Sequence, residues 1–304
     1  MFARRLFALL SVCFATQPAL SQDRESLRPG AETGMERPSR PLPHAAPFEF
    51  TLPPTPAGRP RFADLVAGLN DPKTYGPCIA GLVRLDVATL RRDGARLPAD
   101  RLKRWLQDPG TDPNLADACG FLFAFADPKA APRELTGALL ARAKRGDDAT
   151  GCAMGLLICG GEPAVGWLEN LCERPRCPLG FTLSVLTAAD AAMREPDFNV
   201  DRDRLCEFAV ALLASDAAAA SATDRLADWG AWTHAPKTLA AADRSSDPDP
   251  LRRRSFQLAA TRFALLCMAD SRSGAAGSFC QDWLRETART DPDLIRRARR
   301  IEGR

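Results

Sequence analysis

The 304-residue sequence predicts an all-α protein built of stacked antiparallel helical hairpins. Two observations favour this class. Asp-Pro occurs seven times, and Asp is a good N-cap while Pro fits the first helical turn, so these pairs predict helix starts. Apolar residues also recur at the spacing of one helix face, and no alternating strand pattern competes with them. The predicted helical domain covers residues 61–304.

The first 21 residues read as a secretory signal peptide. Arg4 and Arg5 precede a short apolar run, and Ala19 and Ser21 have the small side chains that a signal peptidase accepts. The run is shorter than the roughly 20 residues of a membrane-spanning helix. We therefore expect an exported protein, periplasmic or secreted, with no transmembrane segment in the mature chain.

Residues 22–60 read as a disordered, Pro-rich linker. They hold nine prolines, few large apolar residues and no helical period. Such a segment cannot bury enough apolar surface to offset the entropy of ordering it. A ligand for another domain is the alternative reading of a Pro-rich stretch.

From residue 61 the apolar positions follow a helical period. Four runs, counted from Cys78, Cys119, Cys152 and Phe256, carry apolar or small residues three, four and seven positions later. These offsets share one helix face, so each run predicts a buried helix. Amphipathic helices follow the runs, and the distances from Cys78 to Trp105 and from Phe256 to Trp283 are both 27 residues. The alternation predicts about six hairpins.

With these features, the chain resembles the HEAT/armadillo-like superfamily of α-solenoids over about residues 62–300. The resemblance is carried by the hairpin period and by stretches such as DPKTYGPCIAGLVRL and DPNLADACGFLFAFA. Members of this class usually serve as binding platforms, so the resemblance implies a protein partner.

The cysteines are expected to be mainly core residues. Five lie at apolar helical positions, and free Cys is among the most buried residue types. They are Cys78, Cys119, Cys152, Cys159 and Cys206. Cys172 and Cys177 flank a turn-like stretch, and they form either a local disulfide or two free thiols. Because close Cys/His pairs are scarce, we expect no metal ion and no cofactor.

The stretch LADWGAWTHAP is the least regular part of the domain. Trp229, Trp232 and His234 lie close together in it, beside a glycine. Trp is common at binding hot spots, so these three residues form the predicted binding site. The alternative is structural, because Trp105, Trp167 and Trp229 are each 62 residues apart and so could fill equivalent places in the array.

Charge argues against nucleic acid as the partner. Without residues 1–21 the chain has 39 Lys and Arg against 38 Asp and Glu, a net charge of +1. The sequence shows no motif of catalysis that would name a reaction. We therefore expect an exported scaffold that binds a protein partner. The alternatives are an α/α-toroid enzyme with a central cavity, or a periplasmic carrier of a small apolar ligand.

Overall fold

The computed structural model describes residues 61–71, 73–174, 176–215 and 217–303, and the all-α prediction is confirmed there. These residues form fourteen α-helices and three short 3₁₀ helices, without a strand. The predicted signal peptide (residues 1–21) and linker (residues 22–60) lie outside the described residues. Residues 62–304 form one compact unit.

The helices follow one another with short connections. Their bounds are α2 (Phe62–Gly68), α3 (Tyr75–Val83), α4 (Val87–Asp93), α5 (Ala99–Gln107), α6 (Pro113–Ala126), α7 (Ala131–Arg145), α8 (Thr150–Cys172), α9 (Leu179–Arg194), α10 (Arg202–Ala211), α11 (Ala219–Asp228), α12 (Ala235–Asp243), α13 (Pro250–Ala269), α14 (Ala275–Thr290) and α15 (Pro292–Ile301). The 3₁₀ helices are η1 (Gly94–Arg96), η2 (Leu212–Ala214) and η3 (Trp232–His234).

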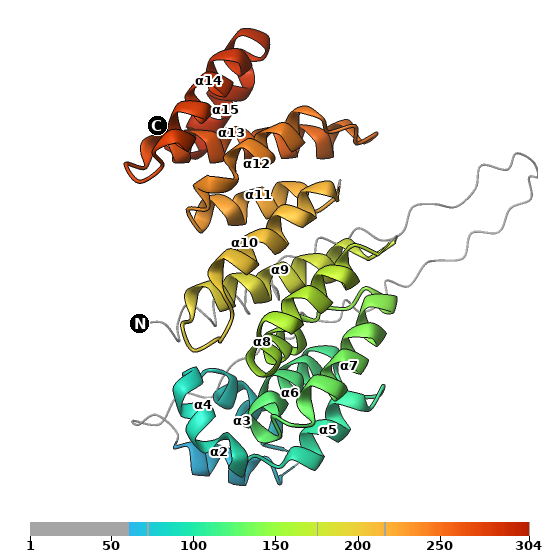
Figure 1. The fold of residues 1–304 in the computed structure, drawn as a ribbon. Helices are drawn as coiled ribbons and strands as arrows, with labels where there is room; N and C mark the ends of the chain where they lie inside the picture. Colours follow the sequence, from blue (N-terminus) through green and yellow to red (C-terminus); the bar gives the residue numbers. More distant parts are fainter. Residues whose placement is uncertain (1–60, 72, 175, 216, 304) are drawn as a thin grey trace, which may run out of the picture. The chain divides into compact units, whose positions relative to one another are not determined.

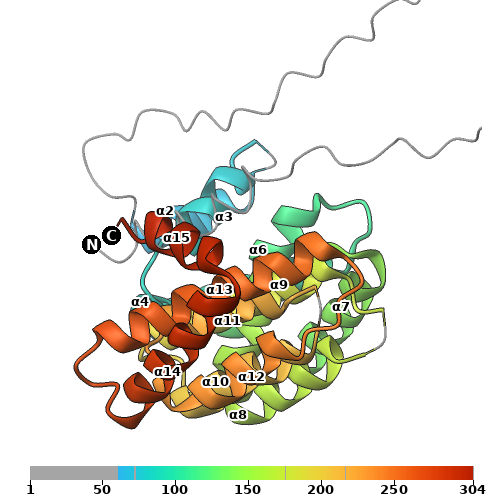
Figure 2. The ribbon, with the colours of Figure 1, turned by 90° about the horizontal axis from the view of Figure 1, so that it is seen from above.

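Packing joins helices that are near in the sequence. Most helices contact the next helix in the chain. In addition, α6 packs on α8, α11 packs on α13, and α13 packs on α15. In Figure 1 the helices advance in chain order from α2 to α14 and α15, and Figure 2 shows α11 and α13 side by side. Such local contacts are typical of helical arrays. The count of six hairpins and the solenoid arrangement stay predictions.

Three of the seven Asp-Pro pairs begin helices as predicted. Asp112, Asp249 and Asp291 each accept a hydrogen bond from a backbone N–H in the first turn of α6, α13 and α15, respectively. At Asp108 and Asp127 the prediction is wrong, because these residues end α5 and α6. Proline disfavours helical geometry at the residue before it, so the same dipeptide also terminates a helix.

Helices α6 and α8 pack closely through two glycines. A Cβ on Gly155 would lie 2.8 Å from the carbonyl oxygen of Gly120, and one on Gly151 would lie 2.5 Å from that of Asp117. Only glycine allows these two backbones to approach so closely. The Asp117 carboxylate accepts hydrogen bonds from the N–H groups of Gly151 and Cys152. It thereby compensates the positive end of α8.

Helix α8 is bent, as its sequence requires. Gly161 has a φ of +56°, and Pro163 follows it. Since proline lacks an N–H, the two segments around Gly161 are joined by a kink rather than by a continuous helix. Among the described helices α8 is also the one long and apolar enough to span a membrane, and 56% of its apolar window is buried against the rest of the protein. A buried helix in the core of a protein meets the same criteria of length and composition, so they are weak evidence for a membrane span.

Candidate functional site

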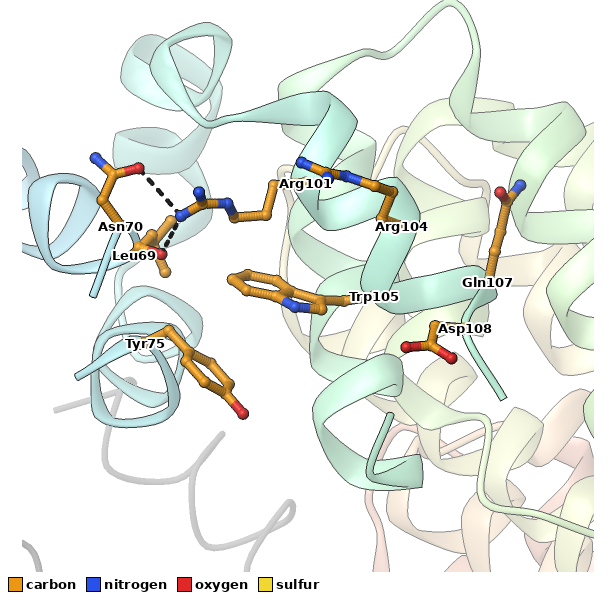
Figure 3. A pocket seen from close by; sticks show the side chains of 8 residues that line it. All are labelled: Leu69, Asn70, Tyr75, Arg101, Arg104, Trp105, Gln107 and Asp108. Atoms are coloured by element: carbon orange, nitrogen blue, oxygen red, sulfur yellow. Dashed lines mark hydrogen bonds between the residues drawn. The ribbon is translucent and has the colours of Figure 1, made fainter. Parts of the chain in front are cut away.

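An open hollow lies beside α5. It has a volume of about 740 Å³ and is open to solvent. Its lining comes from the segment that follows α2, the start of α3, and α5 with the residue after it (Figure 3). The lining residues are Leu69, Asn70, Tyr75, Arg101, Arg104, Trp105, Gln107 and Asp108. We refer to it as the α5 pocket.

The loop between α2 and α3 places Tyr75 at this pocket. Asp71 accepts hydrogen bonds through its carbonyl from the N–H groups of Thr74 and Tyr75, and the Thr74 hydroxyl donates to the carbonyl of Gly68 over 2.8 Å. These bonds close a tight turn. Asx and Thr side chains are suited to such turns because they bond to nearby backbone groups. Tyr75, the single tyrosine of the chain, therefore starts α3 facing α5.

Helix α5 supplies the opposite wall. Leu102 and Leu106 are buried, which leaves the neighbouring face of the helix for Arg101 and Trp105. Residues four apart lie on one face, so the Arg101 guanidinium lies over the Trp105 ring, 5.7 Å from its centroid. A cation over an indole ring is attracted by its negative face. This face of α5 thus combines aromatic area with positive charge.

The two walls meet through their aromatic rings. The ring centroids of Tyr75 and Trp105 are 5.0 Å apart, with 27° between the ring planes, so the rings are stacked (Figure 3). Both residues are half-buried. Arg101 also donates to the carbonyl of Leu69 and, over 3.0 Å, to the side-chain oxygen of Asn70. These contacts tie α5 to the α2–α3 loop.

The pocket carries unbalanced positive charge. Arg101 binds neutral oxygens, and Arg104 is exposed with no ion-pair partner among the described residues. Asp108 is the one carboxylate in the lining. Its Oδ1 accepts the N–H of Gly110 over 2.9 Å at the end of α5. Two guanidinium groups against one carboxylate favour a ligand with negative charge.

The residues of the predicted site, Trp229, Trp232 and His234, do not line the α5 pocket. Trp232 is only 9% exposed, and its ring packs edge-on against Phe263 at 5.2 Å. Its indole N–H donates to Asp270 over 2.9 Å. A partner anchor needs an exposed ring, so the burial favours the structural alternative for Trp232.

Trp229 and His234 are both half-buried, and they have different neighbours. The Trp229 indole N–H donates to Asp190 of α9 over 2.8 Å. Burial lowers the pKa of His234, and nearby Lys237 lowers it further. The two indole groups thus bind carboxylates on separate elements, at Asp190 and Asp270. A binding role for this stretch stays a prediction.

The cysteines are mostly in the interior, as expected. Cys119, Cys152 and Cys206 are buried, whereas Cys78 and Cys159 are half-buried. Cys172 is buried and Cys177 is half-buried, and the Cys177 thiol lies 3.4 Å from the Thr182 hydroxyl. The nearby Cys177 raises the pKa of the Cys172 thiol, and the nearby Cys172 lowers that of Cys177. This proximity leaves both the disulfide and the dithiol open, so the Cys172–Cys177 disulfide stays a prediction.

The α5 pocket was missed in the sequence because its parts come from separate segments. Tyr75 and Trp105 are 30 residues apart, and Trp105 was interpreted only as a repeat position. The sequence signal available for it is that Tyr75 is the single tyrosine of the chain. Within the described residues, no group of three or more His, Cys, Asp or Glu side chains is arranged to hold a metal ion. No family model matches the chain, and neither a curated protein nor a solved structure is significantly similar to it.

Proposed function

We propose that this protein is an exported helical scaffold that binds an acidic, apolar-containing segment of a protein partner in the α5 pocket. The observation that carries the proposal is the stacked pair Tyr75–Trp105 beside two guanidinium groups that have no carboxylate partner within the described part of the chain. Aromatic rings offer contact area at low entropic cost, and arginine pairs with carboxylates in a fixed geometry.

The dimensions of the pocket support a segment rather than a whole surface. A hollow of about 740 Å³ accommodates a few side chains. In this arrangement an apolar side chain of the partner lies against the Tyr75–Trp105 pair. A carboxylate one or two residues away pairs with Arg104, which is exposed and therefore able to reorient. The affinity of such a contact decreases with salt, because exposed charges are screened.

A peptide titration tests this proposal. The probes are two fluorescent peptides of equal length, one with glutamates around a Leu-Pro pair and one with lysines in their place. We expect the acidic peptide to bind the full chain and the basic peptide not to bind. Trp105→Ala and Arg104→Glu should each weaken binding at least about tenfold, equal to about 1.4 kcal/mol.

The matched control is Arg253→Glu, which reverses an exposed arginine of α13 outside the pocket. It should leave the affinity unchanged. Arg104→Glu should in addition gain affinity for the basic peptide, because the sign of the pocket is reversed. If neither peptide binds, or if Arg253→Glu weakens binding as much as Arg104→Glu does, the pocket is not the site of partner recognition.

Export rests on residues 1–21 and is proposed on the sequence pattern alone. The basic start, the apolar run and the small residues before Gln22 support it. N-terminal sequencing of the protein from its native envelope fraction tests it. A mature chain beginning at or near Gln22 supports export, and an intact N-terminus on cytoplasmic protein contradicts it.

A further inference from the structure

A second pair of thiols meets where α13 and α14 join. Cys267 lies in the last turn of α13 and Cys280 in the second turn of α14. Both side chains are fully buried, with 0% exposure. Burial raises the pKa of both thiols, and the neighbouring Cys267 raises the pKa of Cys280 further. The two residues are far enough apart in sequence that no motif suggests the contact.

The turn between the helices brings the two thiols together. Asp270 ends α13 and its N–H donates to the carbonyls of Leu266 and Cys267. Gly274 then takes a φ of +51°, which directs the chain back into α14. One turn before Cys280, a Cβ on Gly277 would lie 3.9 Å from the carbonyl oxygen of Cys267. Helices α13 and α14 pack on each other, so both buried cysteines belong to one helix–helix interface.

We propose that Cys267 and Cys280 form a disulfide that joins α13 to α14 in the mature protein. The oxidant is a disulfide of the glutathione type. A thiolate of one cysteine attacks it and forms a mixed disulfide with release of one thiol. The second cysteine then displaces the other thiol. The protein loses two protons and two electrons, and the oxidant becomes two thiols.

The bond forms while the chain folds, because the native thiols are inaccessible to an external disulfide. In the cell it needs an oxidising compartment and so rests on the export proposed above. Its effect is to restrict the unfolded chain. A loop of about 15 residues closed by a disulfide lowers the entropy of the unfolded state and so raises the melting temperature.

Oxidative refolding tests the disulfide independently of export and of the α5 pocket. The full chain is unfolded with reductant, refolded in a glutathione redox buffer, and blocked with an alkylating reagent in acid. All measurements use a Cys177→Ser background, so that a Cys172–Cys177 disulfide cannot contribute to the peptide map or to the melting temperature. We expect peptide mapping to recover Cys267 linked to Cys280. The oxidised protein should melt about 5–10 °C above the same protein after reduction.

The control variant is Cys267→Ala in the same background. It should melt at the same temperature with and without reductant, which separates the disulfide from packing of the sulfur atoms. Recovery of Cys267 and Cys280 as blocked free thiols, or linked to other cysteines, overturns the proposal.

Discussion

The indole N–H of Trp229 donates to the Asp190 carboxylate over 2.8 Å, and the same kind of bond joins Trp283 to Asp243. Both aspartates follow two alanines, and both tryptophans follow an aspartate. Asp190 is on α9 and Trp229 follows α11, while Asp243 is on α12 and Trp283 on α14. The bond therefore recurs three helices further along the chain, between the same kinds of residue.

The two bonds join the same kinds of residue but differ in burial, so comparing them isolates the effect of burial on the bond. Asp190 is fully buried and also contacts Arg225 at 3.4 Å, whereas Asp243 is exposed. Trp229→Phe should lower the free energy of unfolding by about 2 kcal/mol, because a buried carboxylate loses a donor. Trp283→Phe should cost less than about 1 kcal/mol, because water replaces the lost donor. Urea denaturation measures both, and equal losses would refute the assigned role of burial.

Substitution of Trp232 tests whether this residue is part of the core or anchors a partner. Because its ring packs on Phe263 and binds Asp270, Trp232→Ala should lower the free energy of unfolding by about 3–5 kcal/mol. Binding of the acidic peptide, measured at a temperature where the variant is folded, should be unchanged. Trp232→Phe keeps the aromatic packing and should recover part of the stability. A stable Trp232→Ala variant with lost binding would restore the predicted anchor.

Local patterns were sufficient for the helices but not for the site. The face counted from Phe256 contains Ala259, Ala260 and Phe263, and all three are buried in α13. Such periodicity depends on one helix at a time. The 62-residue spacing of tryptophans, by contrast, did not identify equivalent contacts. The recurrent Asp–Trp bond relates Trp229 to Trp283 instead, and finding it requires the partner carboxylates.

The pocket and the helix crossings depend on contacts between distant segments. Tyr75 and Trp105 stack because the α2–α3 loop and α5 happen to pack against each other, which no single segment encodes. Similarly, Gly155 reads in the sequence as one more small residue on an apolar face. Its function as the point of closest approach to Gly120 emerges only once α6 and α8 are paired.

That close approach predicts opposite effects of one substitution at two glycines. Gly155→Ala should destabilise the protein by about 2 kcal/mol, because the added methyl would lie 2.8 Å from a carbonyl oxygen of α6. Gly137→Ala, in the middle of α7 with nothing within 4 Å, should stabilise it by about 0.5–1 kcal/mol through helix propensity. Thermal and urea unfolding measure both, and destabilisation at Gly137 would contradict the explanation.

Asp117 predicts a pH dependence of opposite sign to that of the surface aspartates. Burial raises its pKa from 3.8 to about 6, although Arg142 and two backbone N–H groups oppose the shift. The folded protein therefore binds this proton more tightly than the unfolded chain does. The stability that the protonated carboxyl contributes is fully present below about pH 4 and is lost as the pH rises through about 6.

The comparison with Asp117→Asn isolates this effect. Between pH 4 and pH 7 the wild type should lose about 2 kcal/mol of unfolding free energy relative to Asp117→Asn. The control is Asp249→Asn at the N-cap of α13. The backbone N–H of Leu251 holds the pKa of Asp249 below its usual value, so this carboxylate stabilises above pH 4 and its contribution is lost in acid. Relative to that variant, the wild type should lose stability only below about pH 4, so this difference should stay nearly constant between pH 4 and pH 7. Urea denaturation across this pH range measures both differences. If the gap to Asp117→Asn does not change with pH, Asp117 ionises in the native protein as it does in the unfolded chain, and its burial against α8 does not perturb its proton affinity.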